Sequence, residues 1–277
     1  MVKKLKKQKL IAEIMKVVGY VSVVLFSILF IEDAYFYIGI IIGLLFILIG
    51  RAIFRRLRET INERLMPEIY KTKLGKSIHR PLEGFNNVEV YATNLFVPQD
   101  RYISNDLVSG EVFGFKYKLS EVHLLDAKKD FKKLTSNTLF QGSFVEVNVE
   151  SQIKGSVYIV PKDTELFHYL GKEHEVGLKE PLSNQLKVLS KNKKEAQKLL
   201  DEEFISLLEK ITTTFPNTYI AVKKHAIYIA IDSRKKPLIV KLFRRLDLSY
   251  LDVLSHEIIT MKEIVYTLYK KTRFQNK

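Results

Sequence analysis

Residues 17–50 read VVGYVSVVLFSILFIEDAYFYIGIIIGLLFILIG. This stretch holds two apolar runs, residues 17–31 and 34–50, which contain no charged residue and are separated only by Glu32 and Asp33. A transmembrane helix needs about 20 predominantly apolar residues to cross a hydrocarbon core of about 30 Å. Each run approaches that length, and basic side chains at its end can extend it by reaching the interface. The pattern predicts a hairpin of two transmembrane helices.

Other arrangements fit this stretch less well. In one continuous helix Glu32 and Asp33 would lie near the middle of the bilayer, where an aspartate costs about 2.5 to 3.5 kcal/mol. A turn between two helices places both carboxylates in water instead. A cleaved signal peptide has one apolar run and small residues at its cleavage site. Here a second run follows at once, and the hairpin is the predicted arrangement.

Positive charge is concentrated on both sides of the hairpin. The 277 residues include 45 Lys and Arg against 31 Asp and Glu, a formal net charge of +14. Residues 1–16, a basic tail, contain six lysines and one glutamate, and residues 51–80 contain nine basic residues and three glutamates. Basic flanks of transmembrane helices stay in the cytoplasm. We therefore expect a multi-pass protein of the cell membrane with both termini cytoplasmic, and topology rather than a nucleic-acid partner accounts for the charge.

A juxtamembrane helix is predicted over residues 51–80, where apolar residues recur every four positions. Pro67 marks a break or restart of this helix. Four basic residues of its first turns either fix the topology or contact anionic lipid headgroups: Arg51, Arg55, Arg56 and Arg58.

Gly39 and Gly43 form a GxxxG pair in the second apolar run. Small residues at this spacing let two helices in lipid approach closely. We expect this face to pack the hairpin against itself, with a matching shallow surface on the first helix formed by Gly19, Ser22 and Ser27. The alternative is a face for homodimerisation.

Residues 81–277 predict a cytoplasmic α+β domain, because the apolar period changes to two after a linker that contains Pro81 and Gly84. Strands with one apolar and one polar face indicate an antiparallel sheet. The predicted strands are residues 88–92, 110–119, 121–126, 138–149 and 155–160, followed by a hairpin of residues 218–222 and 226–231.

Two helical segments complete the predicted domain. One begins near Lys193, and Asp201 is a candidate cap for its second part. The other is a long C-terminal helix from about residue 249 to 271 with a single apolar seam. We expect this seam to pack on the sheet rather than in a coiled-coil dimer. Its residues are Leu251, Leu254, Ile258, Met261, Val265 and Leu268.

A series of short motifs runs through the domain. The motif residues are Gly110, Gly114 and Ser120–Glu121; Phe140, Gly142 and Phe144; Gly155, Val160 and Pro161; residues 187–200; and residues 227–231. In this order, from about Leu65 to Phe243, they resemble a bacterial membrane-protein family known as domain of unknown function 3137. The resemblance implies a two-helix anchor followed by a sheet domain, and it implies no activity. Asn105, Leu107 and a lysine-rich insertion at residues 126–133 depart from the family pattern.

Candidate catalytic and metal-binding residues are few. Cysteine is absent, which excludes thiol nucleophiles and thiolate metal sites. His168 and His174 lie six positions apart, which is not an established ligand spacing, and the pair His256–Glu257 lacks the second histidine of a zincin and is interpreted as helix surface. Ser109 and Ser120–Glu121 lack a nucleophile elbow, and phosphate-binding glycine loops are absent. We predict no cofactor.

Three functions remain open from the sequence. The first is a membrane-anchored cytoplasmic binding or scaffold module, with the bilayer and a protein partner or lipid headgroup as its contacts. The second is a membrane-associated enzyme of unrecognised type. The third is a subunit of an oligomeric membrane complex that self-associates through Gly39 and Gly43. The sequence favours the first.

Overall fold

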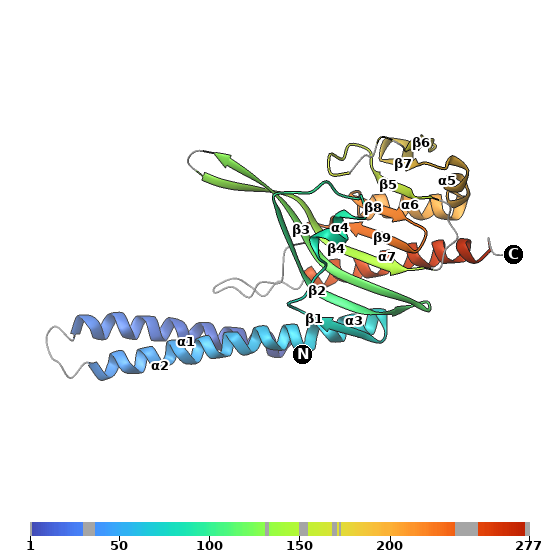
Figure 1. The fold of residues 1–277 in the computed structure, drawn as a ribbon. Coiled ribbons are helices and arrows are strands. Elements are labelled where there is room, and N and C mark those ends of the chain that lie inside the picture. Colours follow the sequence, from blue (N-terminus) through green and yellow to red (C-terminus); the bar gives the residue numbers. More distant parts are fainter. Residues whose placement is uncertain are drawn as a thin grey trace. The chain divides into compact units, whose positions relative to one another are not determined.

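The computed structural model describes residues 2–29, 37–130, 133–149, 155–167, 171, 173–235 and 249–274. The chain divides into two compact units (Figure 1). We call residues 1–68 with 237–250 the helical unit, and residues 69–236 with 251–277 the sheet unit. Their secondary structure confirms the predicted α+β class.

The helical unit is an antiparallel pair of helices, α1 (Val2–Leu29) and α2 (Tyr37–Thr60). Buried positions recur every three or four residues along α2, and buried or half-buried positions do so along α1, which is the spacing of a coiled-coil seam. The predicted basic tail of residues 1–16 is therefore the first part of α1. The turn with Glu32 and Asp33 lies outside the described residues. Buried seam residues include Leu5, Ala12, Ile47, Phe54 and Leu57.

Two stretches of these helices, Lys3–Leu29 and Tyr37–Leu57, are long and apolar enough to cross a membrane. Only 11% and 28% of their apolar windows are buried in the structure. That low burial separates them from the core helices of a water-soluble domain, which are covered by protein.

The helix continues through Pro67 instead of breaking there. A π-helical turn, η2 (Ile61–Leu65), precedes α3 (Met66–Leu74), and the Met66 N–H donates to the carbonyl of Ile61. Proline lacks an N–H and its ring crowds the carbonyl four residues earlier. The wider turn accommodates this crowding, so of the two predicted alternatives at Pro67 the structure shows a restart of the α-helix, at Met66, and not a break.

The predicted juxtamembrane helix of residues 51–80 is too long. Gly75, with φ of +79°, ends α3, and its N–H donates to the carbonyl of Lys71 at 3.0 Å. A glycine in the left-handed region is a common helix stop. Strand β1 (Ser77–Arg80) follows, so the sheet unit begins before residue 81.

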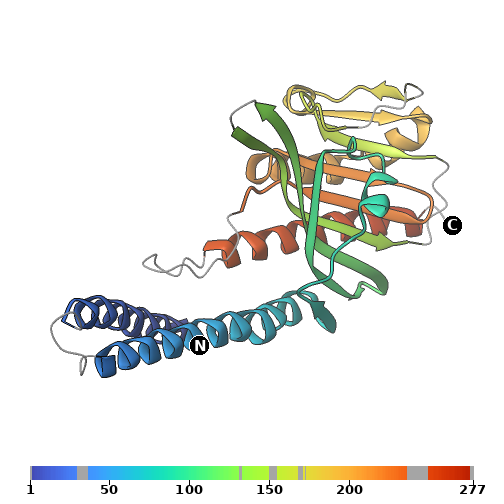
Figure 2. The ribbon, with the colours of Figure 1, turned by 60° about the vertical axis from the view of Figure 1, so that its left-hand side comes forward.

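The described residues of the sheet unit form one nine-stranded antiparallel sheet in the order β1-β2-β3-β4-β9-β8-β5-β7-β6 (Figure 2). The central hairpin matches its prediction, with Thr218 paired to Ile231 and Val222 to Ile227. The strands that follow β1 are β2 (Arg101–Val112), β3 (Phe115–Asp130), β4 (Lys133–Asn148), β5 (Val157–Pro161), β6 (His174–Val176), β7 (Leu186–Ser190) and the two strands of the central hairpin, β8 (Thr218–Val222) and β9 (Ala226–Ile231).

Two strand predictions are wrong. Residues 110–119 contain the turn between β2 and β3, where Phe113 and Gly114 both have positive φ, the conformation of a tight hairpin turn. Residues 88–92 belong mainly to a short helix, α4 (Asn87–Tyr91). Its capping box, in which Asn86 and Glu89 each accept a backbone N–H, overrides the strand preference of its valines and tyrosine.

Helices and loops cover both faces of the sheet. On one face, the segment around α4 contributes Phe85 and Phe96 to a core with Phe140 and Phe144 of β4. On the other face lies α7 (Ser249–Phe274), whose seam is buried as predicted except at Leu251, which is half-buried. Beside it runs α6 (Glu202–Thr214), which follows α5 (Lys193–Leu199). The predicted cap of α6 is confirmed, because Asp201 Oδ1 accepts the Phe204 N–H at 2.9 Å.

Gly142 of β4 lies where no side chain fits. A Cβ built on it would lie 1.8 Å from the carbonyl oxygen of Ile231. We expect Gly142→Ala to lower the free energy of unfolding by about 2 to 3 kcal/mol, as overpacked sites do, in chemical denaturation of the full chain. Gly177→Ala is the control, because a Cβ there meets nothing within 4 Å. An equal loss in both variants would contradict this account.

Candidate functional site

The basic residues in the C-terminal part of α2 are exposed. The side chain of Arg55 is 79% exposed and lies 3.8 Å from Glu59, and Arg51 and Arg56 are exposed as well. The side chain of Arg58 lies outside the described residues. Arg51, Arg55 and Arg56 thus lie exposed toward one end of α2, and their role stays a prediction.

Between residues 9 and 16 of α1, the charged residues face the seam while several large apolar residues face outward. Lys9 is buried and pairs with Glu13, and the ammonium of Lys16 lies 4.3 Å from the centre of the Phe54 ring. Leu10, Ile11 and Ile14 are 56%, 41% and 53% exposed. The apolar outer surface of α1 therefore begins near residue 10, seven residues before the predicted span. The prediction started later because it counted charged residues without considering which face of the helix they occupy.

The glycines lie on the inner face of the hairpin. A Cβ on Gly43 would lie 2.9 Å from the carbonyl oxygen of Gly19, and one on Gly39 would lie 2.3 Å from the ring of Phe26. Gly50 approaches Lys16 in the same way, at 2.7 Å. This geometry uses the small residues for contact between α1 and α2, so they are not on the outer face that a second copy would meet.

Gly43→Leu should loosen the hairpin without changing the oligomeric state. The larger side chain meets the α1 backbone, so we expect thermal loss of helicity in detergent micelles at a lower temperature, while the mass by light scattering is unchanged. Ile42→Leu is the control, because Ile42 is 47% exposed. A change of mass in Gly43→Leu alone would instead indicate a homodimer face.

The candidate catalytic serine and glutamate lie in the middle of β3. The Oγ of Ser120 is 2.9 Å from the Oγ of Ser104, whereas the Oε1 of Glu121 is 3.1 Å from the Nε2 of His123. Successive residues of a strand point to opposite faces of the sheet. Ser120 and Glu121 therefore cannot act together on one substrate.

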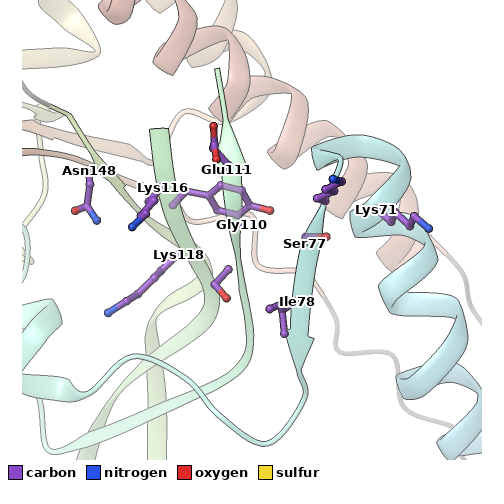
Figure 3. A pocket seen from close by; sticks show the side chains of 11 residues that line it. Lys71, Ser77, Ile78, Gly110, Glu111, Lys116, Lys118 and Asn148 are labelled. Carbon is purple, nitrogen blue, oxygen red and sulfur yellow. The ribbon is translucent and has the colours of Figure 1, made fainter. Parts of the chain in front are cut away.

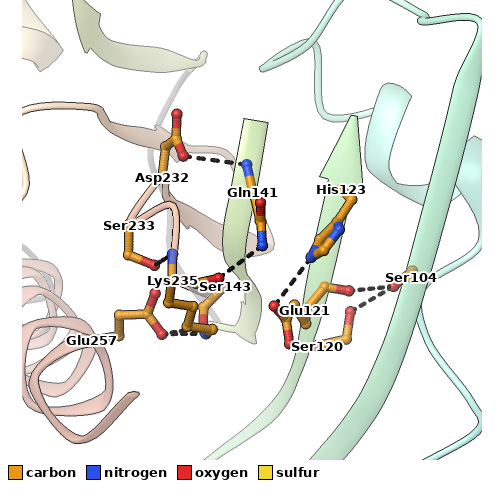
Figure 4. A network of polar contacts seen from close by, with 10 residues as sticks. All are labelled: Ser104, Ser120, Glu121, His123, Gln141, Ser143, Asp232, Ser233, Lys235 and Glu257. Atoms are coloured by element: carbon orange, nitrogen blue, oxygen red, sulfur yellow. Dashed lines mark hydrogen bonds and ion pairs between the residues drawn. The ribbon is translucent and has the colours of Figure 1, made fainter. Parts of the chain in front are cut away.

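A buried charged cluster joins α7 to the sheet (Figure 4). The ammonium of Lys235, just after β9, lies 2.5 Å from Glu257 Oε2 of α7. It also donates to the Oγ of Ser143 in β4 at 3.0 Å, and that hydroxyl donates to Glu257 Oε2 at 2.7 Å. Both charged side chains are 1% exposed. These contacts all use Oε2 of Glu257, whereas its Oε1 is buried without a hydrogen-bond partner among the described residues. The ion pair and the Ser143 hydroxyl join the helix to the sheet.

The backbone around this cluster is also fixed. The side-chain amide of Gln141 donates from Nε2 to the carbonyl of Lys235 at 2.8 Å. The backbone N–H of Gln141 donates to Asp232 Oδ1 at 3.2 Å. Burial raises the pKa of Asp232, and this hydrogen bond opposes the rise. His256 is exposed as predicted, but Glu257 is not helix surface. The burial of Glu257 could have been predicted from the sequence, because this glutamate lies on the apolar side of the helix, beside Ile258.

Removing one member of this cluster should destabilise the protein. Lys235→Met leaves Glu257 buried without a counter-charge, which typically costs about 3 to 5 kcal/mol. The double variant Lys235→Met/Glu257→Met should recover most of that loss in chemical denaturation. Lys210→Met is the matched control, because its pair with Glu263 is exposed and exposed pairs contribute about 0 to 1 kcal/mol. A small loss in Lys235→Met would refute the structural role.

The histidine pair that the sequence analysis rejected as a metal site lies only partly within the described residues. His168 lies outside the described residues, and His174 is exposed on β6. Among the residues that the structure describes, no group of three or more His, Asp or Glu side chains is arranged to hold a metal ion.

Comparison with known proteins finds a family model that matches part of the chain. Residues 138–270 match the family model described as protein of unknown function (DUF3137). The resemblance is confirmed over this segment. The match includes the motif of Phe140, Gly142 and Phe144 but not Gly110 or Ser120–Glu121. In the structure, the two phenylalanines of this motif are core residues and the glycine makes room for β9.

Two further comparisons add little. No curated protein matches the chain. A crystal structure of the mycobacterial trehalose monomycolate transport factor A, TtfA, is similar at 8% sequence identity with a TM-score of 0.43, over 75% of this chain and 96% of that one. At that identity and score the similarity carries no information about function.

Proposed function

We propose that the chain is a membrane-anchored binding or scaffold module whose sheet unit lies in the cytoplasm. The observation that carries this proposal is the outer surface of α1 and α2. Large apolar side chains are half exposed along both helices, including Val24 and Ile28 at 61% and Leu48 at 56%. Soluble monomers rarely expose apolar patches of more than a few hundred Å², whereas lipid covers such a surface.

The orientation follows from charge. Lysines precede the first span, and arginines that include Arg51, Arg55 and Arg56 follow the second, while Glu32 and Asp33 lie between the spans. By the positive-inside rule both basic ends stay in the cytoplasm. The same arginines are exposed and available to anionic headgroups.

Binding is favoured over catalysis by the use of the buried polar residues. Lys235 and Glu257 bind each other, and Ser120 bonds to Ser104 on the opposite side of the sheet from Glu121. These contacts stabilise the fold, and the groups that make them are engaged with other protein groups and not with a substrate. Within the described residues they do not converge on one reacting atom, as catalytic groups must.

Single-cysteine variants test the topology, because the natural chain has no cysteine. In intact cells a membrane-impermeant maleimide should label Asp33→Cys and should label Lys277→Cys only after permeabilisation. Pelleted membranes should contain the protein in both cases. Labelling of Lys277→Cys in intact cells, or recovery of the protein in the supernatant, would overturn the proposal.

Cross-linking in native membranes tests the binding role. We expect the full chain to form specific protein or lipid adducts from the sheet unit that a truncated chain of residues 1–68 does not form. Identical adducts from both chains would assign the contacts to the anchor and not to the sheet unit.

A further inference from the structure

A lysine-rich pocket of about 710 Å³ opens at one end of the sheet, between the turn after α3 and strands β1, β2 and β3 (Figure 3). Four lysines line it against a single acidic residue, Glu111. They are Lys71, Lys76, Lys116 and Lys118.

Most of this positive charge is not neutralised by the protein. Lys118 lies 3.3 Å from Glu89 and 3.9 Å from Glu146. In the part of the chain that the structure describes, no carboxylate lies within 4.0 Å of the ammonium groups of Lys71, Lys76 or Lys116. Clustered like charges repel one another, so an anion between them would lower the energy of the site.

The pocket also offers neutral hydrogen-bond donors. Ser77, Ser109 and Asn148 line it together with Tyr117. Tyr117 is 2% exposed. An interaction with the Ser77 side chain lowers the pKa of its phenol, but burial dominates and raises that pKa to about 12, so the phenol keeps its proton. Ligand oxygens would accept hydrogen bonds from the serine hydroxyls and the Asn148 amide that line the pocket.

Gly110 lets the backbone that carries Lys76 approach the sheet. A Cβ on Gly110 would lie 2.6 Å from the carbonyl oxygen of Lys76 and 3.0 Å from Tyr117 Oη. The absence of a side chain therefore brings an ammonium-bearing turn and the buried phenol to the same place.

One wall of the pocket is apolar. Ile78 of β1 lines it and is 60% exposed. An exposed isoleucine beside basic residues suits a ligand that joins an anionic head to an apolar group. An inorganic anion alone would leave this side chain in water.

We propose that this pocket binds the phosphate group of an organic phosphate, with the apolar part of the ligand against Ile78. The proposal specifies a ligand for the binding module and rests on that proposed function. A phosphate carries about −1.5 to −2 charge and several acceptor oxygens, which matches three unpaired ammonium groups and the surrounding hydroxyl and amide donors. The ligand is either a phospholipid headgroup or a soluble phosphate ester.

Calorimetry on the full chain, embedded in phosphatidylcholine nanodiscs, tests this proposal. The probes are inorganic phosphate, glycerol 3-phosphate and short-chain phosphatidic acid, with short-chain phosphatidylcholine, a zwitterion without net charge, as the reference. We expect a saturable complex with an organic phosphate. Preference for phosphatidic acid assigns a lipid headgroup, and equal binding of glycerol 3-phosphate assigns a soluble ester.

Variants locate the binding. The triple variant Lys71→Ala/Lys76→Ala/Lys116→Ala should weaken binding by about tenfold or more, because each lost lysine removes a charge-assisted contact. The control Lys179→Ala/Lys191→Ala/Lys194→Ala removes the same charge at exposed positions outside the pocket and should leave the affinity within about twofold, since exposed charges at a distance are screened by salt.

Absence of saturable binding, or equal weakening in both triple variants, would overturn the pocket assignment. Either result leaves the anchor untouched, because membrane insertion is scored independently from the pelleted membranes and the maleimide labelling. Loss of insertion with retained phosphate binding would overturn the anchor alone.

Discussion

Burying Lys235 with Glu257 removes two charges from water, which costs several kcal/mol per ion unless each finds a counter-charge and hydrogen bonds. Both requirements are met only when α7 lies on β4, because Ser143 completes the cluster. The geometry therefore selects one position of the helix along the sheet. Apolar residues such as Ile258 and Val265 supply burial there, but an apolar seam alone tolerates sliding by a turn. The ion pair does not.

The two helices of the helical unit also pack along a periodic seam, but here the seam joins helix to helix and includes charged residues. Its positions repeat every three or four residues through the apolar spans and through the basic region. Lys16 over Phe54 and the pair of Lys9 with Glu13 direct charge inward along α1. The outer surface can then be apolar over a length that the charge pattern alone would not suggest.

Sequence periodicity predicted the elements whose apolar faces are continuous, such as α7 and the hairpin of β8 and β9. It failed where local backbone chemistry prevails. The cap at Asn86 makes a helix of strand-forming residues, positive φ at Phe113 turns the chain, and a π-helical turn carries the helix through Pro67. The arginines and glycines of the helical unit could be identified in the sequence as local patterns. The lysine pocket was not, because strand pairing assembles it from four separate segments, around Lys71, Gly110, Lys116 and Asn148.

The family match begins at residue 138, inside β4, and so it includes β9, β8, β5, β7 and β6 but excludes β1, β2 and β3. Strand β4 pairs with β3 along almost its whole length. A chain cut at the family boundary would therefore present a long unpaired strand edge, and it would strip the aromatic core of Phe85 and Phe96. Open edges of this kind recruit other strands and aggregate. The segment that matches the family model is thus smaller than the set of strands that pair with one another in the sheet.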